Sequence, residues 1–123
     1  MLADDNLGFL DAAHRFLDAH HIRIVGEART GREALGLVEV LKPDLLLLDL
    51  EMPELDGWYV LQQIGRKRDR PRIIIVTQHD QDEYRTRAAQ AGADGFVSKR
   101  EFATALMRLI HDIFSEAPNE RLT

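Results

Sequence analysis

The chain has 123 residues, of which 45% are hydrophobic and 30% charged, and its formal net charge is −5. This length suits one domain, this composition excludes a disordered chain, and the negative charge argues against nucleic-acid binding by this chain itself. The lack of cysteine excludes disulfides and cysteine-based zinc sites, and the apolar runs are too short to span a membrane. The first residues lack a signal-peptide pattern, so we expect a cytoplasmic protein.

The chain begins with a very short apolar strand, residues 1–3, followed by two acidic residues. Asn6 is a suitable N-cap for a helix to about residue 19. The inner stripe of that helix contains Leu7, Leu10, His14 and Leu17. Residues 22–28 form the next predicted strand, and its charged side chains place it at a sheet edge. A first strand this short exposes neighbouring backbone, so truncation of this strand stays open and we expect a lowered melting temperature.

Thr30 and Glu33 have the spacing of a capping box and open a second helix, which Pro43 ends. Four consecutive leucines follow, Leu45–Leu48, with neither a helical nor an alternating period. Such a run between turn residues is typical of a strand buried on both faces of a parallel sheet. A third helix then ends in a basic loop. Its inner face is predicted to contain Trp58, Leu61 and Ile64.

The last third of the chain predicts two more strands and two more helices. Residues 73–76 form a second fully buried strand. Asp80 is the expected cap of a helix over residues 81–91, which has few large apolar groups and should be the least firmly packed helix. Gly95–Ser98 is a short strand, and a helix over residues 101–114 leads to a polar, loose tail.

Strand and helix therefore alternate five times. Right-handed crossovers between parallel strands predict a three-layer α/β/α sandwich around a five-stranded sheet. Several polar residues directly follow predicted strands or end them, namely Asp4, Asp5, Asp49, Thr77 and Lys99. The carboxyl ends of parallel strands meet at one edge of the sheet, where ligands bind in this architecture.

Three neighbouring carboxylates would repel one another, and a hard divalent cation such as Mg²⁺ or Mn²⁺ would relieve that repulsion. Asp49 beside such a cation can act as a nucleophile that takes a phosphoryl group as an acyl phosphate. A carboxylate needs no general base. The Thr77 hydroxyl and the Lys99 ammonium can each bind a phosphoryl oxygen.

In this order and spacing, the residues resemble a response regulator receiver domain from residue 2 to about residue 115. The matching features are the acidic pair Asp4-Asp5, Asp49 after a buried strand, Met52-Pro53, Asp56-Gly57, Thr77 and Lys99. The resemblance implies the strand order 2-1-3-4-5, a flavodoxin-like arrangement. It also implies that a sensor histidine kinase phosphorylates Asp49, and that the chain is not an enzyme beyond self-phosphorylation and self-dephosphorylation.

The resemblance further assigns roles to individual residues. Asp5 and Asp49 would ligate Mg²⁺ directly, together with the backbone carbonyl of Glu51, while Asp4 would act mainly through water. Thr77 would move toward the phosphoryl group and make space for Phe96 at the aromatic switch position. This movement would change the conformation of the face formed by the fourth helix, the fifth strand and the fifth helix.

The segment from Gly26 to Leu35 is most similar to the NarL/LuxR-type branch, in which a helix-turn-helix DNA-binding domain follows. The resemblance therefore implies a receiver domain over residues 1–116 and a tail or linker over residues 117–123. DNA would be contacted only through such a C-terminal domain, to control transcription. No membrane partner is expected, and a homodimer is left open.

Two features leave alternatives. Arg100 follows Lys99 where many receivers have proline, which leaves the geometry of that loop open. Glu51, two residues after Asp49, also fits a phosphohydrolase of the haloacid-dehalogenase type. A receiver-like interaction module that is never phosphorylated is a third class. A flavodoxin-type cofactor carrier is disfavoured because no phosphate-binding loop follows the first strand.

Overall fold

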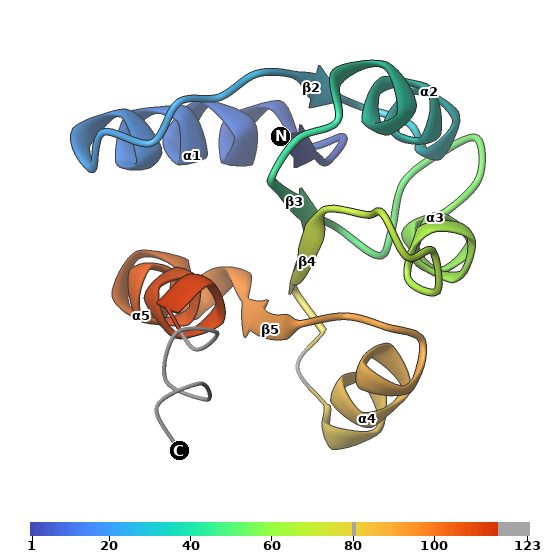
Figure 1. Ribbon diagram of the computed structural model, residues 1–123. Coiled ribbons are helices and arrows are strands. Elements are labelled where there is room, and N and C mark those ends of the chain that lie inside the picture. Colours follow the sequence, from blue (N-terminus) through green and yellow to red (C-terminus); the bar gives the residue numbers. More distant parts are fainter. Residues whose placement is uncertain (80, 116–123) are drawn as a thin grey trace.

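The computed structural model describes residues 1–79 and 81–115 (Figure 1). The elements in chain order are β1 (Leu2–Ala3), α1 (Leu7–Ala19), β2 (Glu27–Ala28), α2 (Gly31–Leu41), β3 (Leu45–Leu48), α3 (Gly57–Ile64), β4 (Arg72–Thr77), α4 (Asp82–Gln90), β5 (Gly95–Ser98), a 3₁₀ turn (Lys99–Glu101) and α5 (Phe102–Ser115). The expected Asp80 cap and the polar tail lie outside the described residues. Within those residues, no helix has the length and apolar character needed to cross a bilayer.

The five strands form one parallel sheet in the order β2-β1-β3-β4-β5. Alternate strand residues point to opposite faces, so the sheet supports two cores. Leu46, Leu48 and Ile75 pack toward α2, α3 and α4. Leu47 and Ile74 pack toward α1 and α5, which cover the other face (Figure 1). The predicted three-layer sandwich with strand order 2-1-3-4-5 is therefore confirmed.

The prediction of a strand over residues 22–28 is wrong for most of its length. Only Glu27 and Ala28 belong to the ladder, where they pair with Leu2 and Ala3. The reason lies in the neighbouring strand, because β1 has only two residues and its backbone hydrogen bonds to this segment reach back only to the Gly26 carbonyl. The length of an edge strand is set by the strand beside it as well as by its own sequence.

The predicted caps are present, and the predicted inner faces are partly right. The backbone N–H of Phe9 donates to Asn6 Oδ1 at 2.9 Å, and that of Glu33 donates to Thr30 Oγ1 at 3.0 Å. Leu10 and Leu17 are buried in α1, but Leu7 is 59% exposed because it starts the helix at the edge of the sheet. Leu41 at the end of α2 is 38% exposed.

Helix α4 is attached by little apolar surface. Ala88 is its fully buried residue, while Tyr84 is only partly buried. Within the described part of the chain, its N-cap residue Gln81 makes no side-chain capping hydrogen bond. These features agree with the expectation that α4 is the least firmly packed helix.

The start of β1 offers a direct stability prediction. The Met1 amino group donates to the Leu45 carbonyl at 2.9 Å, and burial lowers its pKa to about 6 despite the nearby charge of Asp44. Beside it lies an apolar cavity of about 480 Å³, lined in part by Ile22, Ile24 and Leu45. An apolar tripeptide added before Met1 should fill this cavity, continue the ladder and move the ionisable amino group out of its buried position.

We expect that addition to raise the melting temperature by about 5 °C or more, since each well-buried aliphatic side chain contributes about 1.5 kcal/mol or more. Differential scanning calorimetry measures the change. A Gly-Ser-Gly addition is the matched control, because it moves the amino group without adding apolar surface, and it should give the smaller gain. Equal effects of the two additions would show that the cavity contributes nothing.

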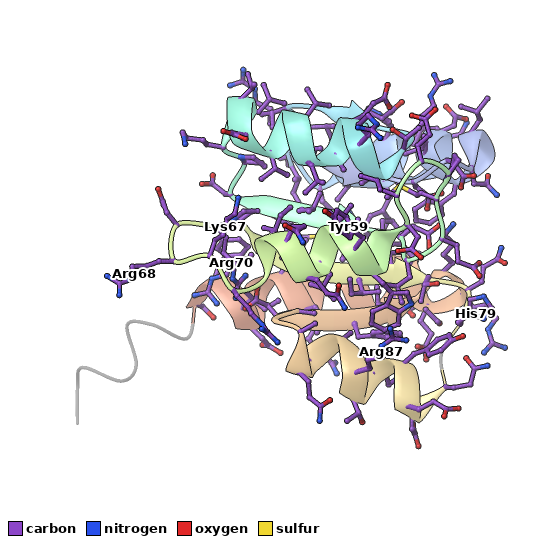
Figure 2. All side chains as sticks on the ribbon, turned by 90° about the vertical axis from the view of Figure 1, so that its right-hand side faces the viewer. Tyr59, Lys67, Arg68, Arg70, His79 and Arg87 are labelled. Carbon is purple, nitrogen blue, oxygen red and sulfur yellow. The ribbon has the colours of Figure 1, made fainter. Side chains whose placement is uncertain are left out.

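Asp94 joins the starts of β4 and β5. Its Oδ2 accepts hydrogen bonds from Arg70 Nη1 and from the Ile73 backbone N–H, both at 2.8 Å, and Arg72 Nη1 lies 3.5 Å from Oδ1. Burial alone would raise the pKa of Asp94, but these hydrogen bonds and the two arginine charges lower it below its ordinary value. Arg70 lies with Lys67 and Arg68 in the basic loop after α3, at the end of the molecule opposite His79 (Figure 2).

Replacing Asp94 by asparagine should lower the free energy of unfolding by about 2 kcal/mol near neutral pH, after allowance for solvent screening. The folded pKa is depressed, so the contribution of Asp94 is present above the unfolded-state pKa of about 4 and is lost as the pH falls through the folded pKa. Urea denaturation at several pH values measures this. Asp69→Asn, an exposed change in the same loop, should alter stability by less than about 0.5 kcal/mol. A gap between wild type and Asp94→Asn that stays constant into the acid range would contradict the assignment.

Candidate functional site

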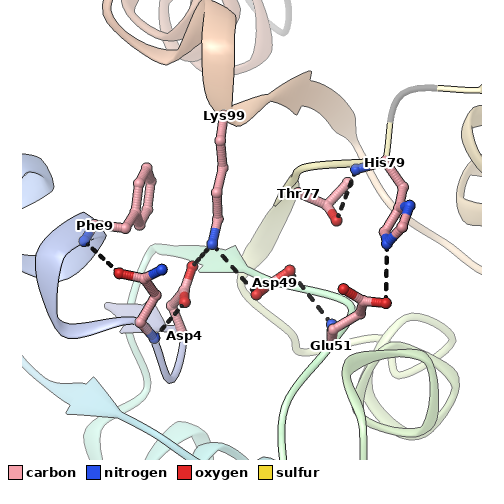
Figure 3. A network of polar contacts seen from close by, with 8 residues as sticks. Asp4, Phe9, Asp49, Glu51, Thr77, His79 and Lys99 are labelled. Carbon is pink, nitrogen blue, oxygen red and sulfur yellow. Dashed lines mark hydrogen bonds and ion pairs between the residues drawn. The ribbon is translucent and has the colours of Figure 1, made fainter.

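The residues predicted at the strand ends meet at one edge of the sheet (Figure 3). The register pairs Ala3 with Leu48, so the next residues, Asp4 and Asp49, leave β1 and β3 side by side. Thr77 ends β4 opposite Ser98 of β5, and Lys99 follows directly. This edge borders a cleft of about 600 Å³. Its lining includes Asp5, Asp49, Glu51, Trp58, Gln78 and Lys99.

Three carboxylates form the centre of the site. One ligand oxygen from each of Asp4, Asp5 and Asp49 lies within 4.8 Å of the others. Asp4 and Asp49 are only 2% and 6% exposed, whereas Asp5 is open to solvent. The Asn6 backbone N–H donates to Asp4 Oδ1 at 2.8 Å, but no described residue gives Asp4 Oδ2 a directed hydrogen bond. A buried oxygen of this kind, in a set of hard oxygen donors, suits a divalent cation such as Mg²⁺.

Lys99 is the positive charge inside this acidic group. Its Nζ forms an ion pair with Asp4 Oδ2 at 2.8 Å and lies 3.5 Å from Asp49 Oδ2. Its side chain is only 12% exposed. Burial, and next the neighbouring Asp4 carboxylate, raise the pKa of Asp49 to about 6, although Lys99 and the Glu51 backbone N–H act in the opposite direction. The Lys99 charge therefore does not fully compensate the Asp49 carboxylate for its burial and for its repulsion by Asp4.

The β4 side of the site holds a contact that the sequence did not indicate. Thr77 is fully buried, and its Oγ1 accepts a weak hydrogen bond of 3.4 Å from the His79 backbone N–H. The His79 side chain reaches toward the loop after β3, where its Nε2 lies 2.9 Å from Glu51 Oε2 (Figure 3). No local sequence pattern marks two loop residues such as these as partners.

Phe96, the predicted switch residue, lies apart from the carboxylate group. It lies on β5 opposite Ile75 and is partly buried against the core beneath α4. The Arg85 guanidinium of α4 stands over its ring, 4.7 Å from the centroid, and Arg85 Nη1 is 3.5 Å from the Phe96 carbonyl oxygen. Phe96 thus connects the strand that leads to Lys99 with the loosely packed helix.

The loop between β3 and α3 is held by backbone contacts. The Gly57 N–H donates to the Leu50 carbonyl at 2.9 Å, and Asp56 Oδ1 caps α3 by accepting from the Tyr59 N–H at 3.0 Å. From the other side, the first N–H groups of α2 point at the carbonyls of Pro53 and Glu54. These contacts fix the path of the chain directly after Asp49.

Comparison with known proteins identifies the family of this chain. The family model of the response regulator receiver domain matches residues 1–111. The chain belongs to this family. The receiver domain spans about half the length of the curated relatives that it matches.

Those relatives are regulators. The DNA-binding transcriptional activator EvgA of Escherichia coli is 35% identical over 101 residues, which are 82% of this chain and 50% of that protein. The response regulator GacA of Pseudomonas aeruginosa is 31% identical over 98 residues, which are 80% of this chain and 46% of that protein.

Solved structures support the same branch. The signal receiver domain of a NarL response regulator from Mycobacterium tuberculosis is 33% identical, with a TM-score of 0.76 over 87% of this chain and 90% of that one. A LuxR-family DNA-binding response regulator from Staphylococcus aureus is 27% identical, with a TM-score of 0.83 over 91% of this chain and 94% of that one. The predicted resemblance to the NarL/LuxR-type branch is therefore confirmed.

Proposed function

We propose that this receiver domain accepts a phosphoryl group on Asp49 from a sensor histidine kinase and thereby switches a partner surface. The observation that carries the proposal is the position of Asp49, buried at the sheet edge with Asp4 and Lys99 within contact distance. A buried carboxylate with a raised pKa, beside a cleft and a lysine, favours a functional site.

Mg²⁺ or Mn²⁺ would be held by the Asp5 and Asp49 carboxylates and the Glu51 backbone carbonyl, with Asp4 acting mainly through water. When bound, the metal supplies the positive charge that lets a phosphoryl group approach three acids. The close grouping of one oxygen from each of Asp4, Asp5 and Asp49, within 4.8 Å of one another, supports this assignment.

The chain's own residues account for the transfer. An Asp49 carboxylate oxygen attacks the phosphorus of the kinase phosphohistidine, the phosphorus–nitrogen bond breaks, and its electron pair stays on the imidazole. Asp49 needs no base because it reacts as the anion. Lys99, which is already 3.5 Å from Asp49 Oδ2, and the Thr77 hydroxyl would each bind a phosphoryl oxygen.

The switch would begin at Thr77. Its hydroxyl accepts a long hydrogen bond of 3.4 Å from the His79 backbone N–H, so breaking that bond to move toward the phosphoryl group costs little free energy. Phe96 would then enter the vacated space and carry the Arg85 contact, and with it α4, to a new position. The α4, β5 and α5 face would change its affinity for partners as a result.

We further propose that residues 1–116 act as the receiver and residues 117–123 as a tail or linker. The names of the relatives favour an output through a C-terminal DNA-binding domain, which would contact DNA and control transcription. Homodimer formation on the switched face remains an option within this proposal. Apart from its own phosphorylation and dephosphorylation, the domain would not act as an enzyme.

The test is incubation with acetyl phosphate and Mg²⁺, followed by intact-protein mass spectrometry and measurement of the phosphate released. We expect up to one phosphoryl group per chain, none with a chelator present, and none on Asp49→Asn. Release of many equivalents of phosphate without a labelled protein would instead indicate a phosphohydrolase. Lack of any Mg²⁺-dependent label would indicate an interaction module that is never phosphorylated.

A further inference from the structure

Phe9 contacts Lys99 from a different part of the chain. Phe9 lies in the first turn of α1, and the Lys99 Nζ stands over its ring, 4.6 Å from the ring centroid. Figure 3 shows the ring beside the lysine side chain, on the side away from Thr77. An ammonium within about 6 Å of an aromatic face is attracted by the ring's electrons, and more strongly where water is excluded. The Lys99 side chain is 12% exposed, so water is largely excluded here.

The Phe9 ring is itself held in place. It packs edge-on against Phe102, with the centroids 5.1 Å apart and an interplanar angle of 78°. Phe102 also contacts Phe16, which lies about two turns after Phe9 in α1, with the ring centroids 5.3 Å apart. Phe102 is buried at the start of α5, directly after the turn that contains Lys99. The ring that faces the ammonium is therefore fixed to the same element that positions the lysine backbone.

The turn after β5 leaves Lys99 in need of such support. Lys99 begins a 3₁₀ turn over Lys99–Glu101 and is followed by Arg100 rather than by a rigid proline. Ser98 Oγ donates to Glu101 Oε1 at 3.2 Å, which steadies the turn but does not touch the ammonium. A lysine side chain has several rotatable bonds and loses considerable entropy when one position is imposed on it. The Asp4 ion pair and the Phe9 ring are the two contacts that bring the amine down toward Asp49.

We propose that Phe9 is a positioning residue for Lys99, whose ring face keeps the ammonium at the sheet edge where it meets a phosphoryl oxygen on Asp49. Unlike Asp4, the ring attracts the ammonium without competing as an anion. When Lys99 turns from the carboxylates to an arriving phosphoryl group, the ring can stay in contact with it. The role of Lys99 in this inference rests on the proposed function. The position of Lys99 beside Phe9 does not.

The first test needs no phosphorylation. A proton above an aromatic ring is shifted upfield, so the Lys99 side-chain methylene signals in a carbon–proton NMR spectrum report the contact. We expect Phe9→Leu to remove the upfield shift and Phe9→Tyr to keep it. Phe16→Leu is the matched control, because it removes an aromatic contact of Phe102 on the same helix without touching Lys99, and it should leave the Lys99 signals in place.

The second test measures the initial rate of labelling by acetyl phosphate with saturating Mg²⁺. Phe9→Leu should lower this rate by about two- to fivefold, the size of a modest cation–π interaction, and Phe9→Tyr should restore it. Phe16→Leu should leave the rate near that of wild type. The thermal unfolding of each variant shows that it is folded.

The outcomes separate the two proposals. Equal loss of rate in Phe9→Leu and Phe16→Leu, or unchanged Lys99 signals in Phe9→Leu, would overturn the positioning role and leave Phe9 as a packing residue. If wild type takes no label at all, the proposed function fails, and the NMR comparison still decides whether Phe9 holds Lys99. A tyrosine variant that keeps the upfield shift without restoring the rate would also overturn the role in transfer.

Discussion

Replacing Asp49 by asparagine is expected to stabilise the metal-free protein at neutral pH by about 2 kcal/mol. The reason is the raised pKa, which burial and the Asp4 carboxylate bring to about 6. In the unfolded chain the same carboxyl titrates near 4, so at neutral pH folding must place a charge where the protein favours the neutral form. The gain is smaller than the raised pKa alone would give, because asparagine also removes a charged partner of Lys99.

The pH dependence provides the internal control. A carboxyl whose pKa is raised on folding favours the folded state fully below its unfolded pKa, and this advantage is lost as the pH rises through the folded value. Wild type and Asp49→Asn should therefore have similar stability near pH ~4, separate as the pH rises from ~4 to ~6, and keep a nearly constant difference above that. Urea denaturation in the presence of a chelator, at several pH values, measures the free energy of unfolding of both proteins. A variant less stable than wild type at neutral pH without metal would contradict our reading of the site.

Added Mg²⁺ should reverse the order of stability. A ligand at about 100 times its dissociation constant stabilises the folded state by about 2.7 kcal/mol, and wild type should gain this while Asp49→Asn gains far less. The same titration on Asp5→Asn should also show a reduced gain. An equal Mg²⁺ effect on all three proteins would place the metal elsewhere.

Replacing Gly57 by alanine should destabilise the protein by about 3 kcal/mol, near the upper end for an overpacked buried position. Gly57 is the buried first residue of α3. A Cβ atom there would lie 2.0 Å from the Asp49 carbonyl oxygen and 2.6 Å from Leu50 Cα. Both are backbone atoms of the segment that presents Asp49, so no flexible side chain can move aside. The clash must shift either α3 or the loop that follows β3.

Gly36→Ala is the matched control for that variant. Gly36 lies within α2 with no atom within 4 Å of its added Cβ, and it is exposed. Alanine at an exposed helix interior should stabilise by about 0.5–1 kcal/mol. Urea denaturation of both variants gives the comparison. If Gly57→Ala is as stable as Gly36→Ala, the close approach between α3 and the end of β3 does not exist.

The site was predictable because the sheet is parallel. Asp4, Asp49, Thr77 and Lys99 each stand at the end of an apolar run, and parallel strands bring such ends to one edge. The two buried strands were predictable for the same reason, since runs such as Leu45–Leu48 have no other stable environment. The order of the strands came from the family resemblance rather than from the pattern of apolar residues.

What could not be predicted depends on pairs of distant residues. The short β2 follows from the length of β1, and nothing within residues 22–28 indicates it. The contact between Phe9 and Lys99 joins residues from opposite ends of the chain, and an α1 phenylalanine has the same pattern whether it faces a core or an ammonium. The pair of His79 and Glu51 depends on how two loops meet.

The most direct test of our central claim is to locate the phosphoryl group. Borohydride reduces an aspartyl phosphate to homoserine, so protein treated with acetyl phosphate and Mg²⁺, then reduced and digested, can be mapped by peptide mass spectrometry. Our account predicts homoserine at position 49, only with Mg²⁺ present. Homoserine at position 4 or 5, or a modification that does not need the metal, would contradict it.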